Sequence, residues 1–126
     1  MKTPHIALLA ALTLAACGGP PPVDSIFTDV RGDGTTISGQ YNAAGFSSAE
    51  ARSIISNVCT DGVLATYGEQ PTETITLVQF TCANGHPYGA NAGVNFKRTG
   101  PNTAAFSAIF SDGNGNLMAA QGDVTF

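Results

Sequence analysis

The chain has 126 residues, of which 43% are hydrophobic and only 11% are charged. This length predicts a single domain, and the low charge, together with 15 glycines and 7 prolines, argues against a charged disordered tail and against a coiled coil. The 5 Lys and Arg residues against 9 Asp and Glu residues provide no basic surface. No nucleic-acid partner is therefore expected.

The N-terminal segment has the layout of an export signal. A short basic leader, residues 1–5, precedes residues 6–16, which carry no charge. A membrane-spanning helix needs about 20 apolar residues, so this run is too short to cross a bilayer. It is typical of the hydrophobic region of a secretory signal peptide.

This run ends in Leu14-Ala15-Ala16-Cys17, which resembles the lipobox of bacterial lipoproteins. The resemblance implies cleavage before Cys17, a diacylglycerol on its sulfur and an acyl chain on its amine, so that the lipid bilayer becomes a partner. In such lipoproteins of two-membrane bacteria, Asp after the cysteine usually retains the protein at the inner membrane. Gly18 stands there in this chain, which favours the outer membrane. The alternative is an ordinary cleaved signal that contains a cysteine.

The resemblance divides the chain into a signal peptide, residues 1–16, a tether, residues 17–24, and one globular domain, residues 25–126. The tether contains two glycines followed by three prolines. Glycine gives such a segment flexibility and proline favours an extended conformation, so we expect it to hold the domain away from the bilayer. A plain N-terminal tail would have the same composition.

With Cys17 acylated, two cysteines remain in the mature chain, Cys59 and Cys82. An even number of cysteines in an oxidising compartment predicts a disulfide bond. A redox centre of the Cys-x-x-Cys type is absent from the sequence. A zinc site is the other alternative, but it would need four ligands, and only His86 is an obvious addition to the two cysteines.

The strongest helix signal lies between residues 47 and 58. Ser47 followed by Glu50 forms a capping box, and apolar residues then recur at helical spacing: Ala51, Ile54, Ile55 and Val58. Residues 60–62, Thr-Asp-Gly, end the helix. The apolar stripe is narrow, which predicts a helix that lies on the surface of a sheet.

Elsewhere apolar and polar residues alternate with a period of two, as in a β-strand. Six strand candidates follow from it: residues 35–41, 63–67, 74–81, 94–97, 103–110 and 117–121. The segment 74–81 is rich in β-branched residues and is expected to be the central strand. Residues 29–34 are expected to be a turn. Because the turns are short and no second helix is predicted, an antiparallel meander is the simplest connection.

These elements predict an α+β fold, in which one amphipathic helix packs on a five- to six-stranded, mostly antiparallel sheet. The disulfide would join the end of the helix to the sheet beside its central strand. Lys97 and Arg98 form a dibasic step that is expected to be solvated. The sequence indicates no cofactor.

Two loops are candidates for chemistry. The first contains His86 and Tyr88 within a run of turn-forming residues, and loops on rigid scaffolds often carry function. A solvated surface loop is the alternative for this segment. The sequence contains no nucleophile elbow, Walker loop or dinucleotide fingerprint.

The second loop resembles the opening of an EF-hand calcium loop. It offers Asp112, Asn114 and Asn116, with Asp123 at the twelfth position. Leu117 occupies the place that requires glycine, Asp replaces the usual Glu at position twelve, and the flanking segments are predicted strands. We therefore expect a hairpin turn and no metal site here.

Three functions remain open. The first is a non-catalytic envelope lipoprotein, which binds or scaffolds another envelope component and for which strand addition at a sheet edge is one binding mode. The second is a small-ligand or metal-ion binding lipoprotein that uses one of the two loops. The third is an envelope hydrolase. The scarcity of catalytic motifs favours the first, so the chain is not expected to be an enzyme.

Overall fold

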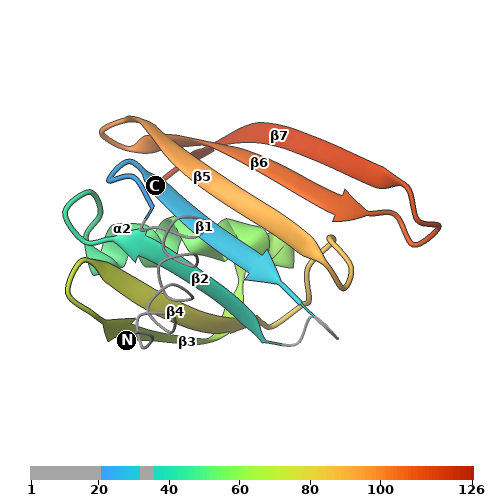
Figure 1. Ribbon diagram of the computed structural model, residues 1–126, viewed down its shortest axis with the longest axis horizontal. Helices are drawn as coiled ribbons and strands as arrows, with labels where there is room; N and C mark the ends of the chain where they lie inside the picture. Colours follow the sequence, from blue (N-terminus) through green and yellow to red (C-terminus); the bar gives the residue numbers. More distant parts are fainter. Residues whose placement is uncertain (1–20, 32–35) are drawn as a thin grey trace, which may run out of the picture.

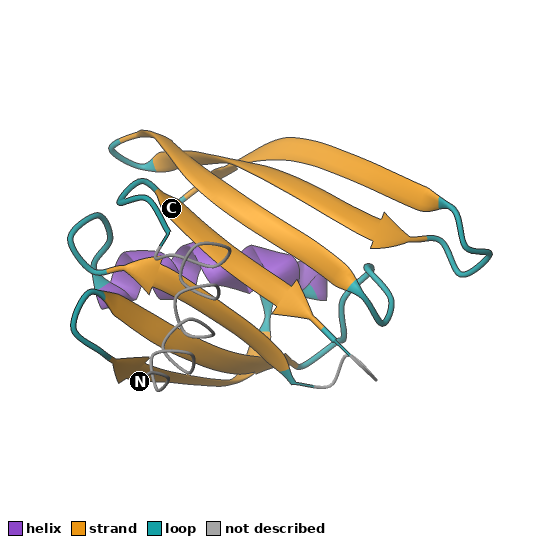
Figure 2. Cartoon of the chain, viewed as in Figure 1, coloured by secondary structure: helices purple, strands orange, loops and turns teal. Residues whose placement is uncertain are grey.

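A computed structural model describes residues 21–31 and 36–126. Its strands form one sheet, with a short helix on one face (Figures 1 and 2). The elements in chain order are β1 (Ser25–Val30), β2 (Ile37–Asn42), α2 (Ser48–Ile55), η1 (Ser56–Val58), η2 (Thr60–Gly62), β3 (Leu64–Pro71), β4 (Ile75–Cys82), β5 (Ala92–Gly100), β6 (Thr103–Ser111) and β7 (Leu117–Thr125). The predicted lipobox and signal peptide lie outside the described residues.

The expected α+β fold with five to six strands is wrong. The described residues form a mostly β structure with seven strands, and its helix is short, with eight α-helical residues in α2 and three more in η1. The strand missing from the prediction is β1. Its alternation is present, since Ile26, Thr28 and Val30 are buried, but the sequence predicts a turn from Asp29 onward.

The strand order β3-β4-β2-β1-β5-β6-β7 also differs from a simple meander. Every neighbouring pair is antiparallel. After β1 and β2, strand β4 pairs with β2, and β3 pairs with β4 at the edge. The chain then returns to the other side of β1, where β5, β6 and β7 follow in order. The central strand is therefore β1 and not residues 74–81, which form most of β4, the second strand from one edge. Hydrophobic periodicity contains no information on this strand order, because the order depends on pairing between distant segments.

Helix α2 begins with the predicted capping box. The Glu50 backbone N–H donates to Ser47 Oγ at 3.1 Å, and the Ser47 backbone N–H donates to Glu50 Oε1 at 3.0 Å. The side chains of Ala51, Ile54 and Ile55 are fully buried against the sheet. As the stripe predicts, the helix covers one face of the sheet and leaves its other side in solvent.

The core lies between α2 and the sheet. Alternate residues of the strands point into it, and the largest fully buried side chains on the helix and strands are Phe80, Phe96, Ile26, Ile37, Ile54, Ile55, Val30, Val58, Val78 and Val94. At the far end of the sheet, the ring of Phe106 lies over Gly122, where a Cβ would come within 2.5 Å of a ring carbon. This close packing explains the glycine in the middle of β7.

Cys59 and Cys82 are joined in a disulfide, with their Cα atoms 5.2 Å apart. Cys59 lies between the helical turns η1 and η2, and Cys82 is the last residue of β4. The bond therefore ties the helix to the sheet beside β4. Just beyond it, the Thr60 backbone N–H donates to the Gly85 carbonyl at 2.8 Å, which holds the loop after β4 against the end of the helix.

Arg98 is not the solvated side chain that its dibasic step predicts. Its guanidinium donates to Glu50 Oε1 and to the Gly45 carbonyl, both at 3.0 Å. It also lies over the rings of Phe46 and Phe126, at 4.7 and 5.0 Å from their centroids. These contacts clamp the start of the helix to β5 and the C-terminus.

Residues that precede β1 also make backbone contacts with the domain. The Arg98 backbone N–H donates to the Asp24 carbonyl at 2.7 Å, and the Ser25 N–H donates to the Pro22 carbonyl at 3.0 Å. The last residues of the proposed tether therefore pack on the domain. Among the residues that the structure describes, no helix has the length and apolar character that crossing a membrane requires.

Candidate functional site

Within residues 21–31 and 36–126, the sheet face opposite α2 carries no helix, and we call it the open face (Figures 1 and 2). The strand register places one residue from each of the seven strands in a single row across it. From edge to edge, this central row reads Gln70, Leu77, Gln40, Phe27, Asn95, Ser107 and Gln121. Four of the seven side chains are amides, one is a hydroxyl, and none is charged.

A second row lies two residues away on the same face and carries two charged side chains, those of Lys97 and Asp123. It consists of Ser25, Lys97, Ala105 and Asp123, each opposite the next in the register. Lys97 Nζ lies 4.0 Å from the carboxylate of Asp24, and its side chain is 70% exposed. Such an exposed pair contributes little to stability, so Lys97 can exchange Asp24 for a ligand at small cost.

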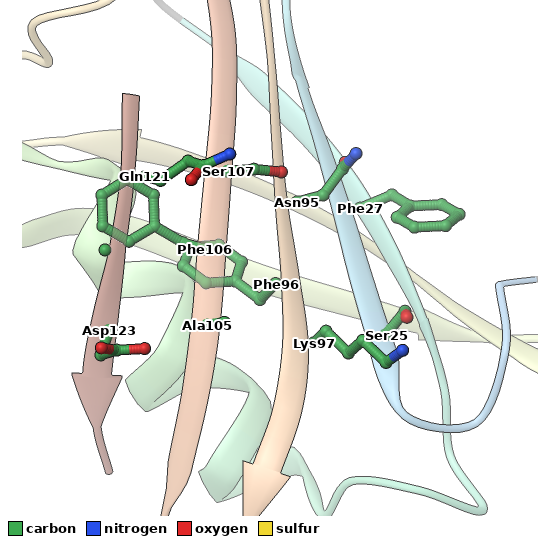
Figure 3. A pocket seen from close by; sticks show the side chains of 11 residues that line it. Ser25, Phe27, Asn95, Phe96, Lys97, Ala105, Phe106, Ser107, Gln121 and Asp123 are labelled. Atoms are coloured by element: carbon green, nitrogen blue, oxygen red, sulfur yellow. The ribbon is translucent and has the colours of Figure 1, made fainter. Parts of the chain in front are cut away.

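The two rows enclose a groove of about 520 Å³, which we call the Ala105 groove (Figure 3). Its floor is formed by the strands at Phe96, Phe106 and Gly122. The groove exists because the Ala105 side chain is a single methyl group between the longer side chains of Lys97 and Asp123. In Figure 3, Asn95, Ser107 and Gln121 line one end of the groove and Lys97 and Asp123 the other.

A second groove, of about 480 Å³, lies on the other side of Phe27. It is lined by Ser38, Gln40, Leu77, Gly93 and Asn95, among others. A Cβ built on Gly93 would meet nothing within 4 Å, so the missing side chain leaves this groove open. Phe27 thus stands between two grooves, as the one aromatic ring of the central row.

The His86–Tyr88 loop is part of the framework of the domain. The Tyr88 backbone N–H donates to His86 Nδ1 at 3.2 Å, and the two rings stack at 6.3 Å between centroids. Tyr88 is only 8% exposed and packs edge-on against Phe110 at 5.4 Å. Burial raises the pKa of the Tyr88 hydroxyl above its usual value.

The Asp112 turn has the predicted hairpin geometry, and its carboxylate caps the turn. Asp112 Oδ1 accepts from the backbone N–H groups of Asn114 and Asn116, at 2.8 and 3.2 Å, and Oδ2 accepts from the Asn116 amide at 3.1 Å. These hydrogen bonds lower the pKa of Asp112. Asp123 lies far along β7, six residues or about 20 Å beyond Leu117, so the turn and Asp123 do not form one site.

The structure does bring the two predicted loops together. Pro87, Gly89 and Asn91 face Phe110 and Asp112 across a groove of about 510 Å³. Within the described residues, however, no three His, Cys, Asp or Glu side chains are placed to hold a metal ion. Cys17, the predicted lipidation site, lies outside the part of the chain that the structure describes.

Sequence reasoning missed Phe27 and the central row. A signal was present: in residues 25–30 the inward phase belongs to Ile26, Thr28 and Val30, so Phe27 has to point outward. Asn95 and Ser107 also occupy outward positions of predicted strands. That these residues share one row depends on the strand order, which the sequence does not show.

A polar cluster on the helix side of the sheet is a further site that the sequence does not indicate. Tyr41 and Tyr67 both donate to Glu69 Oε2, at 2.9 and 2.7 Å, and Ser48 donates to Glu69 Oε1 at 2.9 Å. Arg52 lies over the Tyr67 ring at 5.3 Å from its centroid. The cluster ties the edge strand β3 to β2 and to the start of α2.

The tyrosines of this cluster predict a loss of stability at high pH. Burial, and then the Glu69 carboxylate, raise the pKa values of both Tyr41 and Tyr67 above their usual 10.0. The stabilisation is complete below pH 10 and is lost as the pH rises further, because the unfolded chain then releases these protons more readily than the folded one. Chemical denaturation between pH 8 and 11 should show the free energy of unfolding falling above pH 10.

The variant Tyr67→Phe serves as the control for this titration. It should lower the free energy of unfolding at pH 8 by about 1 kcal/mol, because one hydrogen bond is lost, and it should make the fall above pH 10 shallower. An identical pH dependence in Tyr67→Phe and the wild-type chain would show that Tyr67 is not responsible.

Comparisons of the chain with protein-family models, with curated proteins and with solved structures found no match.

Proposed function

We propose that this chain is a lipid-anchored lipoprotein of the bacterial envelope, favoured to lie at the outer membrane, and that it acts as a non-catalytic module which binds another envelope component through the open face. The anchor is supported by the lipobox sequence that ends at Cys17. The observation that carries the binding role is the central row, which presents amides on both sides of Phe27 and a hydroxyl on one side.

The side chains of the central row indicate the kind of ligand that it would bind. Amide side chains both donate and accept hydrogen bonds, and the half-buried ring of Phe27 offers a flat apolar surface. Together they suit an extended, uncharged partner that is rich in hydrogen-bonding groups and lies across the strands. The two grooves beside Phe27 have volumes in the range of ligand sites. Both lie open on the surface of the sheet, so the partner can be longer than either groove.

The non-catalytic role is supported by the positions of the candidate catalytic side chains. His86 Nδ1 accepts the hydrogen bond of the Tyr88 backbone, and the Asp112 carboxylate closes its own turn. Asp123 lies on the open face, away from both. These three candidate side chains are thus engaged in structural roles or lie apart from one another.

A photo-crosslinking experiment tests the open face as the binding surface. A benzophenone amino acid replaces Ser107, the central-row residue of β6, or Ser53, an exposed residue of α2, in the full-length chain within cells. We expect Ser107 to give one dominant adduct of defined mass that Ser53 does not give. Equal adduct patterns from the two faces would overturn the proposal.

Filling the Ala105 groove is the matched perturbation. Ala105→Gln places a longer polar side chain between Lys97 and Asp123, on the open face, without touching the core. The yield of the adduct from position 107 should fall at least tenfold, while the melting temperature changes little. An unchanged yield would show that the partner does not use this groove.

A further inference from the structure

The two ends of the described sheet differ in how they protect their unpaired backbone groups. At one end, β3 has a register shift against β4 between Leu64 and Thr66, carries Glu69 and ends in Pro71. Bulges, charges and prolines of this kind discourage the addition of another strand. The β3 edge is therefore protected against the addition of another strand.

The other end, β7, has none of these features apart from one charge. It is nine residues long and pairs with β6 without a register shift, and Asp123 is its only charged residue. Leu117 and Met118 are 78% and 45% exposed, and Ile109 on the neighbouring strand is 59% exposed. A long, regular, apolar edge is a template for pairing with another strand. Figure 1 shows β7 along the outer margin of the sheet.

We infer that β7 pairs antiparallel with β7 of a second copy of this chain, about a two-fold axis at Gln121. Gln121 is the middle residue of the strand, so this register pairs all nine residues of both copies. A two-fold contact uses the same surface twice and closes on itself. In this register odd-numbered residues face odd-numbered ones and even-numbered residues face even-numbered ones. The helix side of one copy therefore continues into the helix side of the other, and the two helices lie on the same side of one continuous sheet.

The side chains are self-complementary in this register. On the helix side, Met118 of one copy faces Val124 of the other, which brings two apolar side chains together. On the open face, Asp123 faces Ala119, and the two Gln121 amides can bond to each other. No like charges oppose each other, whereas a register centred on Asp123 would place the two carboxylates face to face.

The contact also completes the binding surface. Asp123 forms one wall of the Ala105 groove, and in the paired form the second copy's Ala119 lies directly beyond it. The central rows of the two copies then meet at Gln121 and become one row across both sheets. Pairing of the two copies thus extends the open face, and it does not depend on the lipid anchor.

The experiment uses the full-length chain in cells, with a benzophenone amino acid in place of Leu117. Illumination should give an adduct of twice the monomer mass. The same amino acid in place of Thr66, on the β3 edge, is the control for crowding of copies on a membrane, and it should give little of this adduct. Equal dimer adducts from both edges, or a β7 adduct of any other mass, would overturn the inference.

Charge variants test the register itself. In the variant Ala119→Asp, the new carboxylate of each copy faces Asp123 of the other copy, so each dimer contains two pairs of like charges. This should weaken association by about two- to thirtyfold. Asp123→Lys alone should leave the dimer adduct near its wild-type level, because Lys then faces Ala119. The double variant Ala119→Asp with Asp123→Lys should restore or exceed that level. Failure of the double variant to recover the adduct lost in Ala119→Asp would rule out this register.

Discussion

Replacing Cys17 with serine should release the protein from the envelope membranes. A serine hydroxyl does not take the place of the thiol that the lipobox resemblance assigns to the diacylglycerol. Each buried methylene contributes about 0.8 kcal/mol to membrane binding, and two or more acyl chains are needed for a stable anchor. Since three chains would be lost, the expected effect is near-complete loss of membrane association.

The measurement is fractionation of cells on a density gradient, followed by the intact mass of the extracted protein. Wild-type chain should sediment with membranes and have the mass expected for cleavage before Cys17 plus acyl chains. Gly18→Asp is the matched control: it keeps the acylated cysteine and should stay membrane-bound, but move from the outer to the inner membrane. Undiminished membrane association of Cys17→Ser would remove the basis for the anchor.

Removing the Cys59–Cys82 bond should have the largest effect on stability. The bond closes a loop of 23 residues, and the chain-entropy model assigns about 3 kcal/mol to a loop of this size. A domain of about 100 residues has a total stability of only about 5–15 kcal/mol. The double variant Cys59→Ala with Cys82→Ala should therefore melt at least about 10 °C lower than wild type.

Reductant provides the control for this variant. It should lower the melting temperature of the wild-type protein towards that of the double variant and leave the double variant unchanged. The intact mass of the wild-type protein should rise by two hydrogens on reduction. A wild-type mass and melting temperature that do not respond to reductant would show that the two thiols are not joined in the protein.

The features that the sequence determines by itself are local. The capping box at Ser47 and Glu50, the buried stripe through Ile54 and Ile55, and the hairpin turn at Asp112 each depend on residues within one or two turns of chain. Short-range hydrogen bonds and side-chain periodicity suffice for them, and the structure shows all three. The predicted export signal is also a contiguous pattern, but it lies outside the described residues and stays a prediction.

Strand order and the binding surface depend on contacts between distant segments. Nothing within Ser25–Val30 shows that it is the central strand, since that place comes from pairing with β2 on one side and β5 on the other. The same pairing aligns Phe27 with Asn95 and sets Ala105 between Lys97 and Asp123. Register between strands is a long-range choice, made by the burial of one face of every strand at once, so only the tertiary structure could decide which outward side chains share a site.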